Sequence, residues 1–538
     1  MTPQQKVAPM KNALETKMNE HLARLTQEHA VTRLWQRDAA LFTTDIAVQK
    51  TIRDRLGWLF HIDAMRSQIE RLAVLARVTT RLSYDRVLVV GMGGSSLWPE
   101  VLGKHLKGKR GLPVRIIDST HPEAIAEVIA WGQQGQPLFV IATKSGGTIE
   151  TVSTYRALRE IWKDGGSYLA ITDPGSSLET LAKAEGFRDT FLNPPDIGGR
   201  FSAGTLFGLV PAVLAGVVLH DALDRMADVL ENCHDEDLLS NPGAQLGAFL
   251  AAAHDVGRWQ LRLALGPDVN GFGAWIEQLV GESTGKLGVG LLPMTGELPE
   301  SGEELAAKLA HATVIGLTTF ASPDQDFLTR AIDADVPTQA FVLPEVADLW
   351  TEVVRWEAAT AFCGLLLNIN PFDEPDVSAA KAATTGLLNG TLQPVDADRT
   401  FAVKSLATLP DLLADELAAL SVDDYLAVLA WMPGNGANQQ RLEKLRQSLQ
   451  AKTNAAVVVQ IGPRYLHSTG QFHKGGQKRG TFLFIDDFKR LEGAVPDIAI
   501  PGQPFGFATL VRAQCDGDVA VLKARGKKVI RVRLELGK

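Results

Sequence analysis

Two glycine-rich turns in this sequence carry the residue types that bind phosphate. The first, GMGGSS at residues 91–96, directly follows the apolar run 87–90. Glycines let the backbone approach a ligand closely, and a helix N-terminus offers unpaired N–H groups and a positive dipole end to an anion. The turn therefore predicts a phosphate or pyrophosphate site, with a tight turn of purely structural purpose as the alternative. Its spacing matches neither a nucleotide-binding P-loop nor a clean dinucleotide fingerprint.

The second turn, TKSGGTIET at residues 143–151, follows the apolar run 138–142 and adds hydroxyl groups and one ammonium group. Both turns would lie at the carboxyl ends of strands, where doubly wound sheets bind ligands. We therefore expect one phosphate to be held from both sides, unless the Ser and Thr side chains only cap the helix. The turns offer no P-loop lysine and no carboxylate placed to hold Mg²⁺, so we expect the phosphate to be a binding handle and predict no metal site. The candidate phosphate-binding residues are Ser95, Thr143, Lys144, Ser145 and Thr148, with Gly94 as a further candidate.

The elements that must position these turns are short β-branched runs separated by helical stretches. Candidate strands of the first set span residues 86–90, 114–118, 138–143 and 167–172. This alternation is typical of a parallel sheet with helices on both faces.

A second set of candidate strands follows the Asn-Pro-Gly break at residues 241–243. It covers residues 288–292, 313–318 and 339–343, and a long helix is expected over 346–368. Upstream of the first set, residues 12–80 place apolar side chains at helical spacing.

The last part of the sequence is predicted to be helical up to residue 449 and rich in strands from residue 455, at 457–461, 481–485 and 529–534. We therefore predict an α/β fold in four parts. These are an N-terminal helical region (1–80), two doubly wound parallel-sheet subdomains (81–244 and 245–385) and a C-terminal α+β module (386–538).

Five motifs in order resemble the glucose-6-phosphate isomerase family. They are the two turns, then PDIGGRFS (195–202), QLVGESTGK (278–286) and NPFDEPDV (370–377) with Lys381. A further segment, GPRYLHSTGQFHKGG (462–476), is similar to the isomerase half of bifunctional transaldolase/glucose-6-phosphate isomerase proteins, although nothing in the chain would house the transaldolase barrel. The resemblance implies two sugar isomerase (SIS) type subdomains with the active site between them, and no cofactor.

The resemblance also implies a reaction and roles for three residues. The reaction is the interconversion of glucose 6-phosphate and fructose 6-phosphate through a cis-enediol(ate), a step of glycolysis and gluconeogenesis. Glu282 matches the carboxylate that moves the proton between C2 and C1, and Arg200 matches the arginine that stabilises the enediolate. Lys381 matches the lysine that assists ring opening. The alternatives are a surface glutamate, a salt-bridge arginine and a solvated helix lysine.

One expected residue is absent from its usual place. In most isomerases of this family a histidine that helps to open the ring follows the catalytic glutamate, but here only His311 lies between Glu282 and Asn370. His311 is not in a matching motif. We therefore expect the C-terminal segment to supply a replacement, with His467 preferred over His473, unless both histidines are structural.

A second departure is Glu374, where the family pattern has glutamine. A carboxylate beside an anionic sugar phosphate is repulsive unless Lys381 or another cation pairs with it. Glu374 is therefore a candidate site residue whose role is open.

Two other functions compete with the leading hypothesis. One is an isomerase that also accepts mannose 6-phosphate, and the other is a non-catalytic regulator that binds a sugar phosphate. The family's histidine commonly comes from a partner subunit, so both a homodimer and a monomer completed by its own His467 are consistent with the sequence.

Composition restricts the class of protein and its partners. The chain has 538 residues, with 62 acidic and 54 basic side chains and a formal net charge of -8, so we expect several domains and no nucleic-acid partner. The three scattered cysteines match neither a disulfide framework nor a metal site. The polar N-terminus lacks a signal-peptide core, and no apolar run is long enough to span a bilayer. We therefore expect a cytoplasmic protein with no membrane partner.

Overall fold

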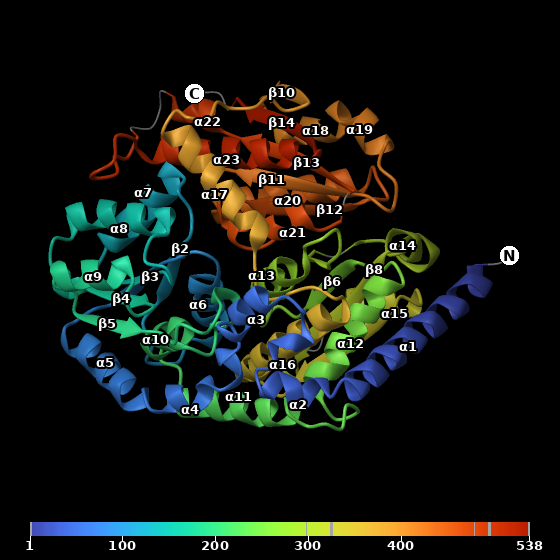
Figure 1. Ribbon diagram of the computed structural model, residues 1–538. Coiled ribbons are helices and arrows are strands. Elements are labelled where there is room, and N and C mark those ends of the chain that lie inside the picture. The colour runs from blue at the N-terminus through green and yellow to red at the C-terminus, as the bar shows by residue number, and fades with distance from the viewer. Residues whose placement is uncertain (1–2, 297, 323–325, 478, 493–496, 536–538) are drawn as a thin grey trace.

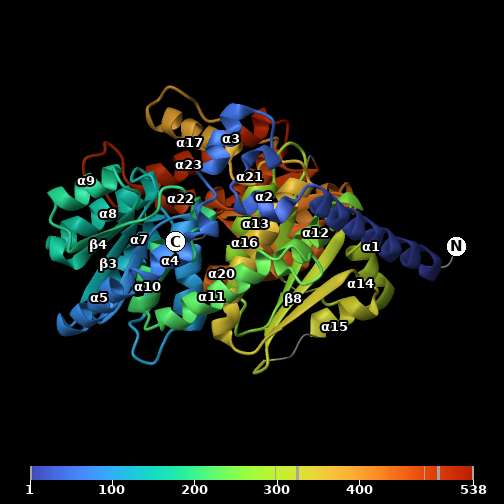
Figure 2. The same cartoon turned by 60° about the horizontal axis from the view of Figure 1, so that its bottom comes forward.

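Three parallel sheets form the framework of the molecule, each within its own α/β unit (Figure 1). The computed structural model describes residues 3–296, 298–322, 326–477, 479–492 and 497–535, with side chains from residue 13. The first unit lies on the left of Figure 1, the second at the lower right, and the third across the top. Figure 2 shows the same three groups from a different side.

The first sheet has the strand order β2-β1-β3-β4-β5, with every pairing parallel. Its strands are β1 (Arg86–Val90), β2 (Val114–Ile117), β3 (Pro137–Ala142), β4 (Tyr168–Thr172) and β5 (Asp189–Leu192). The helices are α6 (Leu97–Val101), α7 (Pro122–Gly132), α8 (Ile149–Ile161), α9 (Ser177–Ala184), α10 (Leu206–Leu214) and α11 (Leu219–Cys233). Strand β3 is buried along its whole length, as expected for a parallel sheet covered on both faces. The first four strands confirm the sequence prediction, whereas β5 was not predicted.

The second sheet has the order β7-β6-β8-β9 and is also parallel. Its elements are α12 (Pro242–Asp255), β6 (Gln260–Leu265), α13 (Phe272–Thr284), β7 (Leu292–Met294), α14 (Gly302–Lys308), β8 (Ala312–Thr319), α15 (Asp326–Asp333), β9 (Thr338–Leu343) and α16 (Leu349–Leu366). The strand predicted at 288–292 starts only at Leu292, because Gly288 and Gly290 have positive φ angles and form a turn.

The third sheet has the order β10-β14-β13-β11-β12 and corrects one expectation. All its pairings are parallel, so the C-terminal module is α/β and not α+β. Its strands are β10 (Arg399–Val403), β11 (Tyr425–Trp431), β12 (Ala456–Ile461), β13 (Gly480–Asp486) and β14 (Lys528–Leu534). Its helices are α17 (Pro375–Leu388), α18 (Leu409–Leu412), α19 (Ala414–Ala418), α20 (Gly436–Gln450), α21 (Gly470–Gly475), α22 (Phe488–Leu491) and α23 (Phe507–Ala524). Helix α17 packs along α23 and so joins this unit.

The N-terminal region consists of helices that pack against the first two units. They are α1 (Pro3–Gln27), α2 (Ala30–Trp35), α3 (Ile46–Arg53), α4 (His61–Arg66) and α5 (Ile69–Arg81). Helix α1 lies against α12 of the second unit and begins on the right of Figure 1.

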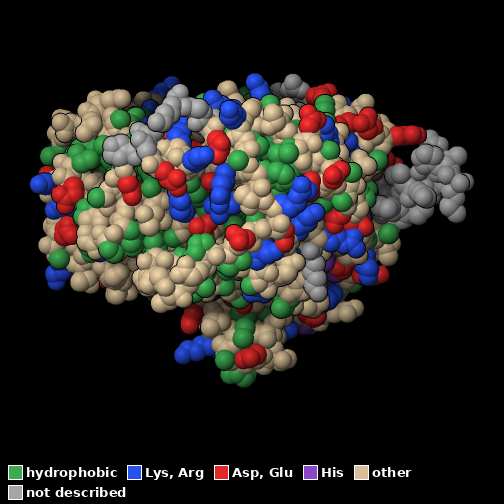
Figure 3. Space-filling view, turned by 90° about the horizontal axis from the view of Figure 1, so that it is seen from above, with side chains coloured by type: hydrophobic (Ala, Val, Ile, Leu, Met, Phe, Trp, Pro, Cys, Tyr) green, Lys and Arg blue, Asp and Glu red, His purple; other side chains and the backbone are tan. Residues whose placement is uncertain are grey.

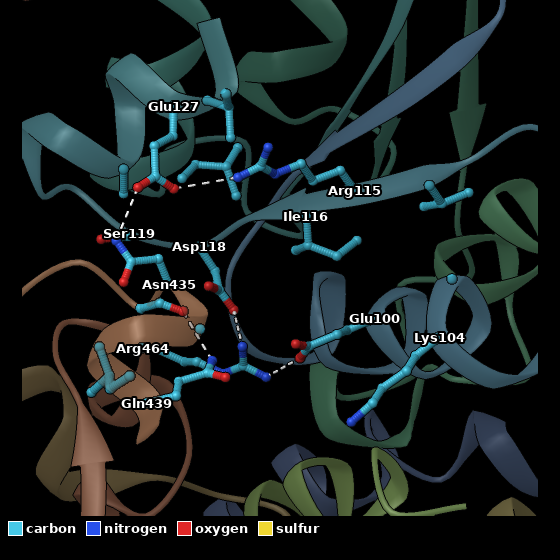
Figure 4. Close-up of a pocket in the computed structure, with 18 of the residues that line it drawn as sticks. Glu100, Lys104, Arg115, Ile116, Asp118, Ser119, Glu127, Asn435, Gln439 and Arg464 are labelled. Carbon is cyan, nitrogen blue, oxygen red and sulfur yellow. Dashed lines mark hydrogen bonds and ion pairs between the residues drawn. The ribbon is translucent and has the colours of Figure 1, made fainter. Parts of the chain in front are cut away.

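Ion pairs connect the third unit to the first at the polar cavity of Figure 4, which has a volume of about 510 Å³. Arg464, just after β12, lies 3.5 Å from Asp118 and forms a second ion pair with Glu100. Across the same cavity, Asn435 donates a hydrogen bond to Glu127 at 3.0 Å. These contacts fix the position of the segment that contains His467.

Viewed from the side of the third unit, basic and acidic side chains are interspersed (Figure 3). No helix in the described residues is both long and apolar enough to cross a membrane. Within the same part of the chain, no group of three or more His, Cys, Asp or Glu side chains could hold a metal ion.

Candidate active site

Most of the predicted site residues line one cavity of about 410 Å³, which we call the central cavity. The first unit contributes the turns after β1 and β3, the second unit contributes α13, and the third contributes α17 and the segment after β12. The predicted residues in its wall are Gly94, Ser95, Thr143, Lys144, Ser145, Thr148, Arg200, Glu282, Glu374, Lys381 and His467. The fold thus brings together residues that are far apart in the sequence.

Gly94 is required by the close approach of two turns. A Cβ atom at this position would lie 1.9 Å from the carbonyl oxygen of Gly199. The neighbouring Gly93 has a φ of 55°, and a Cβ there would meet the Gln278 side chain and the His467 backbone. The first glycine-rich turn therefore lets the segments that carry Arg200 and His467 approach the end of β1.

The second turn supplies hydroxyl groups to the central cavity. The Thr143 and Thr148 hydroxyls are 2.7 Å apart and hydrogen-bonded, and Ser145 is exposed in the same wall. The Lys144 ammonium forms an ion pair with Asp173 and donates to the Pro195 carbonyl oxygen at 2.8 Å. The Lys144 charge is therefore partly neutralised at the rim of the cavity.

Arg200 is the most extensively bonded side chain of the site. It is 4% exposed, and its Nε donates to the Ser283 hydroxyl at 2.7 Å. Its Nη2 donates to the carbonyl oxygens of Pro371 and Asp373 at 2.7 and 3.0 Å. A guanidinium held by several acceptors is a fixed cation that needs no reorganisation when negative charge develops nearby.

Two carboxylates share the Arg200 Nη1 atom. Glu282 lies 3.4 Å from this nitrogen and Glu374 lies 3.0 Å from it. Burial raises the pKa of Glu282, and Glu374 raises it further, while Arg200 opposes both effects. Burial would also raise the pKa of Glu374, but Arg200 holds it below its usual value. The cation that offsets the charge of Glu374 is therefore Arg200, not Lys381.

Lys286 fixes the loop that carries Glu374. Its ammonium donates to the Asn370 carbonyl oxygen at 2.7 Å and to the Asp373 carboxylate at 2.8 Å. Burial and the nearby Arg200 lower the pKa of Lys286 to about 8. This lysine acts on the site through the loop conformation.

His467 enters the cavity from the short helix after β12 and pairs with a buried acid. Its Nε2 lies 2.9 Å from Glu150 Oε1, which also accepts a hydrogen bond from Gln514 at 2.8 Å. Burial would raise the pKa of Glu150, but His467 holds it below its usual value. The His467 backbone oxygen accepts a bond from Gln278 at 2.8 Å, and Gln278 also donates to Glu282 at 3.2 Å. Gln278 thus links the two acid–base candidates.

Lys381 lies where the central cavity meets a second cavity of about 380 Å³, which it lines together with His467 and Glu150. The Lys381 side chain is exposed. After burial and His467, it is one of the charges that act on the Glu150 pKa, and it lowers that pKa.

The other candidate histidines lie elsewhere. His473 is fully buried in the third unit, where its ring lies 2.7 Å from the Gln460 side-chain oxygen and stacks on Tyr425. It does not line the central cavity, because α21 turns it toward the sheet. His311 Nδ1 donates a hydrogen bond to the Gly257 carbonyl oxygen at 2.8 Å, and its Nε2 pairs with Asp423, outside the site.

Glu150 and Gln514 are site residues that sequence reasoning missed. Glu150 lies two positions after Thr148, and an acid in the first turn of a helix is usually explained by the helix dipole. The unusual feature is that this acid is buried, with 6% of its surface exposed, and the sequence does not reveal it. Gln514 lies on α23 without any motif, so no signal in the sequence could have found it.

Comparison with known proteins gives the family. The sequence model of the family described as Phosphoglucose isomerase matches residues 11–286, about half of the chain. The chain belongs to the phosphoglucose isomerase family. Lys381 and His467 lie beyond the matched residues.

Curated relatives agree with this assignment. A glucose-6-phosphate isomerase of Acetivibrio thermocellus is 28% identical over 396 residues, which cover 62% of this chain and 87% of the relative. One of Bacillus cereus is 28% identical over 426 residues, or 67% of this chain and 92% of the relative.

Solved structures support the fold. A hypothetical protein from Thermus thermophilus matches with a TM-score of 0.58 and 21% identity, covering 69% of this chain and 97% of that chain. A glucose-6-phosphate isomerase from Chlamydia trachomatis matches with a TM-score of 0.53 and 17% identity, covering 72% and 86%. Both similarities concern the fold alone.

Proposed function

We propose that this chain interconverts glucose 6-phosphate and fructose 6-phosphate through a cis-enediolate. The observation that carries the proposal is the convergence of Glu282, Arg200 and His467 on one cavity that is also lined by a hydroxyl-rich turn. A base, a fixed cation and an imidazole at these places are the groups that proton transfer next to a carbonyl and ring opening require.

The phosphate handle is assigned to the wall formed by the two glycine-rich turns. Ser95, Thr143, Ser145 and Thr148 line the cavity, and their hydroxyls and the backbone N–H groups of the turns are the proposed hydrogen-bond donors to the phosphate. Lys144 contributes positive charge from the rim, reduced by its pairing with Asp173. Anchoring the phosphate here places the other end of the sugar toward Glu282 and Arg200.

Glu282 is assigned the transfer of the proton between C2 and C1. It removes the proton from C2 of the open-chain aldose, and the electron pair of that C–H bond forms the enediolate. Arg200 stabilises the oxygen on which negative charge collects. The proton of the C2 hydroxyl passes to the C1 oxygen, and Glu282 returns its proton to C1, so that C2 becomes the carbonyl carbon of the ketose. Burial raises the Glu282 pKa, which strengthens the carboxylate as a base, while Arg200 keeps its ionised form accessible.

Ring opening is assigned to His467, with Lys381 assisting. Glu150 accepts from His467 Nε2 when that nitrogen carries the proton, and it therefore fixes the orientation of the ring. His467 belongs to the same chain as Glu282, so a monomer contains every proposed group. We extend the proposal to a cytoplasmic enzyme of glycolysis and gluconeogenesis; the kinship to bifunctional transaldolase proteins stays a prediction.

The test is fructose 6-phosphate turnover by the purified protein, with EDTA present and the glucose 6-phosphate product coupled to its dehydrogenase. We expect turnover by the wild type and its loss in Glu282→Gln, with sugar phosphate binding retained. Binding without turnover by the wild type would overturn the proposal in favour of a non-catalytic regulator. Running mannose 6-phosphate as a second substrate measures the substrate range.

A second comparison isolates ring opening. His467→Ala is expected to lose turnover of the cyclic sugar but to retain turnover of an open-chain sugar phosphate that cannot form a ring. Equal losses with both substrates would contradict the role of His467 in ring opening.

A further inference from the structure

The carboxyl edge of the third sheet opens onto a cavity of about 620 Å³, larger than the central cavity. It lies where β10, β14 and β11 end: Lys404 follows β10, Leu534 ends β14 and Met432 follows β11. Helix α20 forms another wall. Ligands of parallel α/β sheets bind at this edge. We call this space the basic cavity.

The charged residues that line the basic cavity are Lys404, Arg441 and Lys444, and none of its lining residues is acidic. Among the described residues, no carboxylate lies within ion-pair distance of these three cations. Glu535, the acid nearest in sequence to the end of β14, is paired with Lys489, and Lys404 acts on it only from a greater distance. In a chain with a net charge of -8, this is a local positive field with little internal compensation.

Two of the three cations lie on the same face of helix α20. Asn438, Arg441 and Lys444 follow each other at intervals of three residues, so their side chains lie on neighbouring positions of one helix face. Like charges at this spacing repel each other, and a bound anion would relieve the repulsion. Ser405 and Asn438 lie in the same wall. The Ser405 hydroxyl accepts from the Ala407 N–H and the Asn438 amide donates to the Pro433 carbonyl oxygen, and each group retains one further hydrogen to donate.

The cavity of Figure 4 lies at the same edge of the third sheet, but its main charged side chains form ion pairs with one another. There Arg464 is paired with Glu100 and Asp118, and Arg115 lies 3.4 Å from Glu127. Its main charges therefore neutralise each other and tie two units together. The cations of the basic cavity have no such partners among the described residues.

The remaining wall of the basic cavity is apolar. Met432 and Leu445 are 2% and 4% exposed, and Leu406 and Leu534 lie beside them in the wall. A small inorganic anion would leave this surface unused. A ligand with both phosphate groups and a flat apolar body matches both kinds of wall.

We propose that the basic cavity is a second ligand site, which binds a nucleoside di- or triphosphate. The phosphates lie against Lys404, Arg441 and Lys444, and the base lies on the apolar wall next to Met432. The site shares no lining residue with the central cavity, so it is separate from sugar phosphate binding.

Isothermal titration of the full chain with ATP tests the proposal. The test variant is Arg441→Glu/Lys444→Glu, and the matched control is Arg81→Glu/Lys183→Glu, which changes the net charge equally on exposed helix positions of α5 and α9. We expect the test variant to weaken ATP binding at least tenfold and the control to change it less than twofold. Fructose 6-phosphate at saturation should leave ATP binding unchanged.

Four results would overturn the proposal: no ATP binding by the wild type at millimolar concentration, equal binding in both charge-reversed variants, competition by fructose 6-phosphate, or equal affinity for pyrophosphate and ATP. The last result would remove the role of the apolar wall. If Arg441→Glu/Lys444→Glu does not fold, Arg441→Gln/Lys444→Gln takes its place, and an affinity equal to that of the wild type would then overturn the proposal. Isomerase turnover, measured in parallel, should be unchanged in every variant.

Discussion

Glu374 offers a sharp test of the electrostatics of the site, because Glu374→Gln removes one charge and keeps the shape. Glu374 and Glu282 both contact Arg200 Nη1, and Glu374 is one of the charges that raise the Glu282 pKa. The Glu374 pKa is held below its usual value, so this carboxylate is ionised in the neutral range. Removing it should lower the Glu282 pKa.

The two distances to Arg200 set the size of this effect. Two unit charges about 6 Å apart, close to the largest separation that these contacts allow, repel by about 3 kcal/mol at an effective dielectric constant of about 20. The Glu374 side chain is 42% exposed, so solvent and salt screen part of the repulsion. If screening leaves roughly half of this repulsion, removing the Glu374 charge favours the ionised form of Glu282 by about 1.4 kcal/mol, which lowers the Glu282 pKa by about one unit.

The assay is the pH dependence of kcat/KM for fructose 6-phosphate, whose acid limb reports the pKa of the base in the free enzyme. Glu374→Gln should move this limb to lower pH by about one unit. Glu160→Gln, the same substitution at an exposed position of α8, is the control and should leave the limb in place.

The direction in which the acid limb moves in Glu374→Gln tests the coupling between the two carboxylates. An acid limb that stays in place, or that moves to higher pH, would refute the coupling between Glu374 and Glu282. Loss of turnover at every pH in Glu374→Gln would show instead that Glu374 takes part in proton transfer.

Three further substitutions test other parts of the account. Arg200→Lys keeps the charge but loses the multiple hydrogen bonds, so kcat should fall by about 10²–10³-fold with little change in KM, and a change in KM alone would contradict a role in the transition state. Glu150→Gln removes the charged partner of His467, and turnover of the cyclic sugar should fall about 10–100-fold more than turnover of an open-chain analogue; equal losses would be inconsistent with this. Glu357 is fully buried without a partner among the described residues, and burial raises its pKa well above the usual value. The Glu357 pKa is higher in the folded state than in the unfolded state. The free energy of unfolding is therefore unaffected by ionisation of Glu357 below about pH 4.5, and it falls as the pH rises toward the folded-state pKa. Glu357→Met should therefore stabilise the protein by about 1–3 kcal/mol at pH 8 and by less at pH 5, measured by thermal unfolding at both pH values.

The sequence predicted those strands whose patterns were unambiguous. Strand β1 is an uninterrupted β-branched run bounded by a glycine turn, and it was predicted with its observed limits. Strand β11 was missed because it is an interior strand of the sheet that is buried along its whole length, so its apolar run has no alternation to distinguish it from a buried helix. The parallel order of the third sheet depends on long-range pairings such as β10 with β14, which local patterns do not report.

Site residues could be predicted from the sequence where they belong to recognisable motifs. The two turns were found because their residue types are distinctive, and Arg200 and Glu282 were found because their motifs resemble those of the family. His467 and His473 share one glycine-flanked segment, and only packing decides that the first faces the cavity and the second faces the core. The pairing of His467 with Glu150 crosses 317 positions of the sequence and could not be inferred from either residue.

Hydrogen exchange at C1 of fructose 6-phosphate in D₂O, followed by NMR, shows whether Glu282 is the base that moves the proton. If Glu282 carries the proton between C1 and C2, the wild type should incorporate deuterium at these carbons during turnover. Glu282→Gln should bind the sugar phosphate and show neither exchange nor turnover. Exchange and turnover by Glu282→Gln at the rate of the wild type would contradict the account, because another group would then be the base.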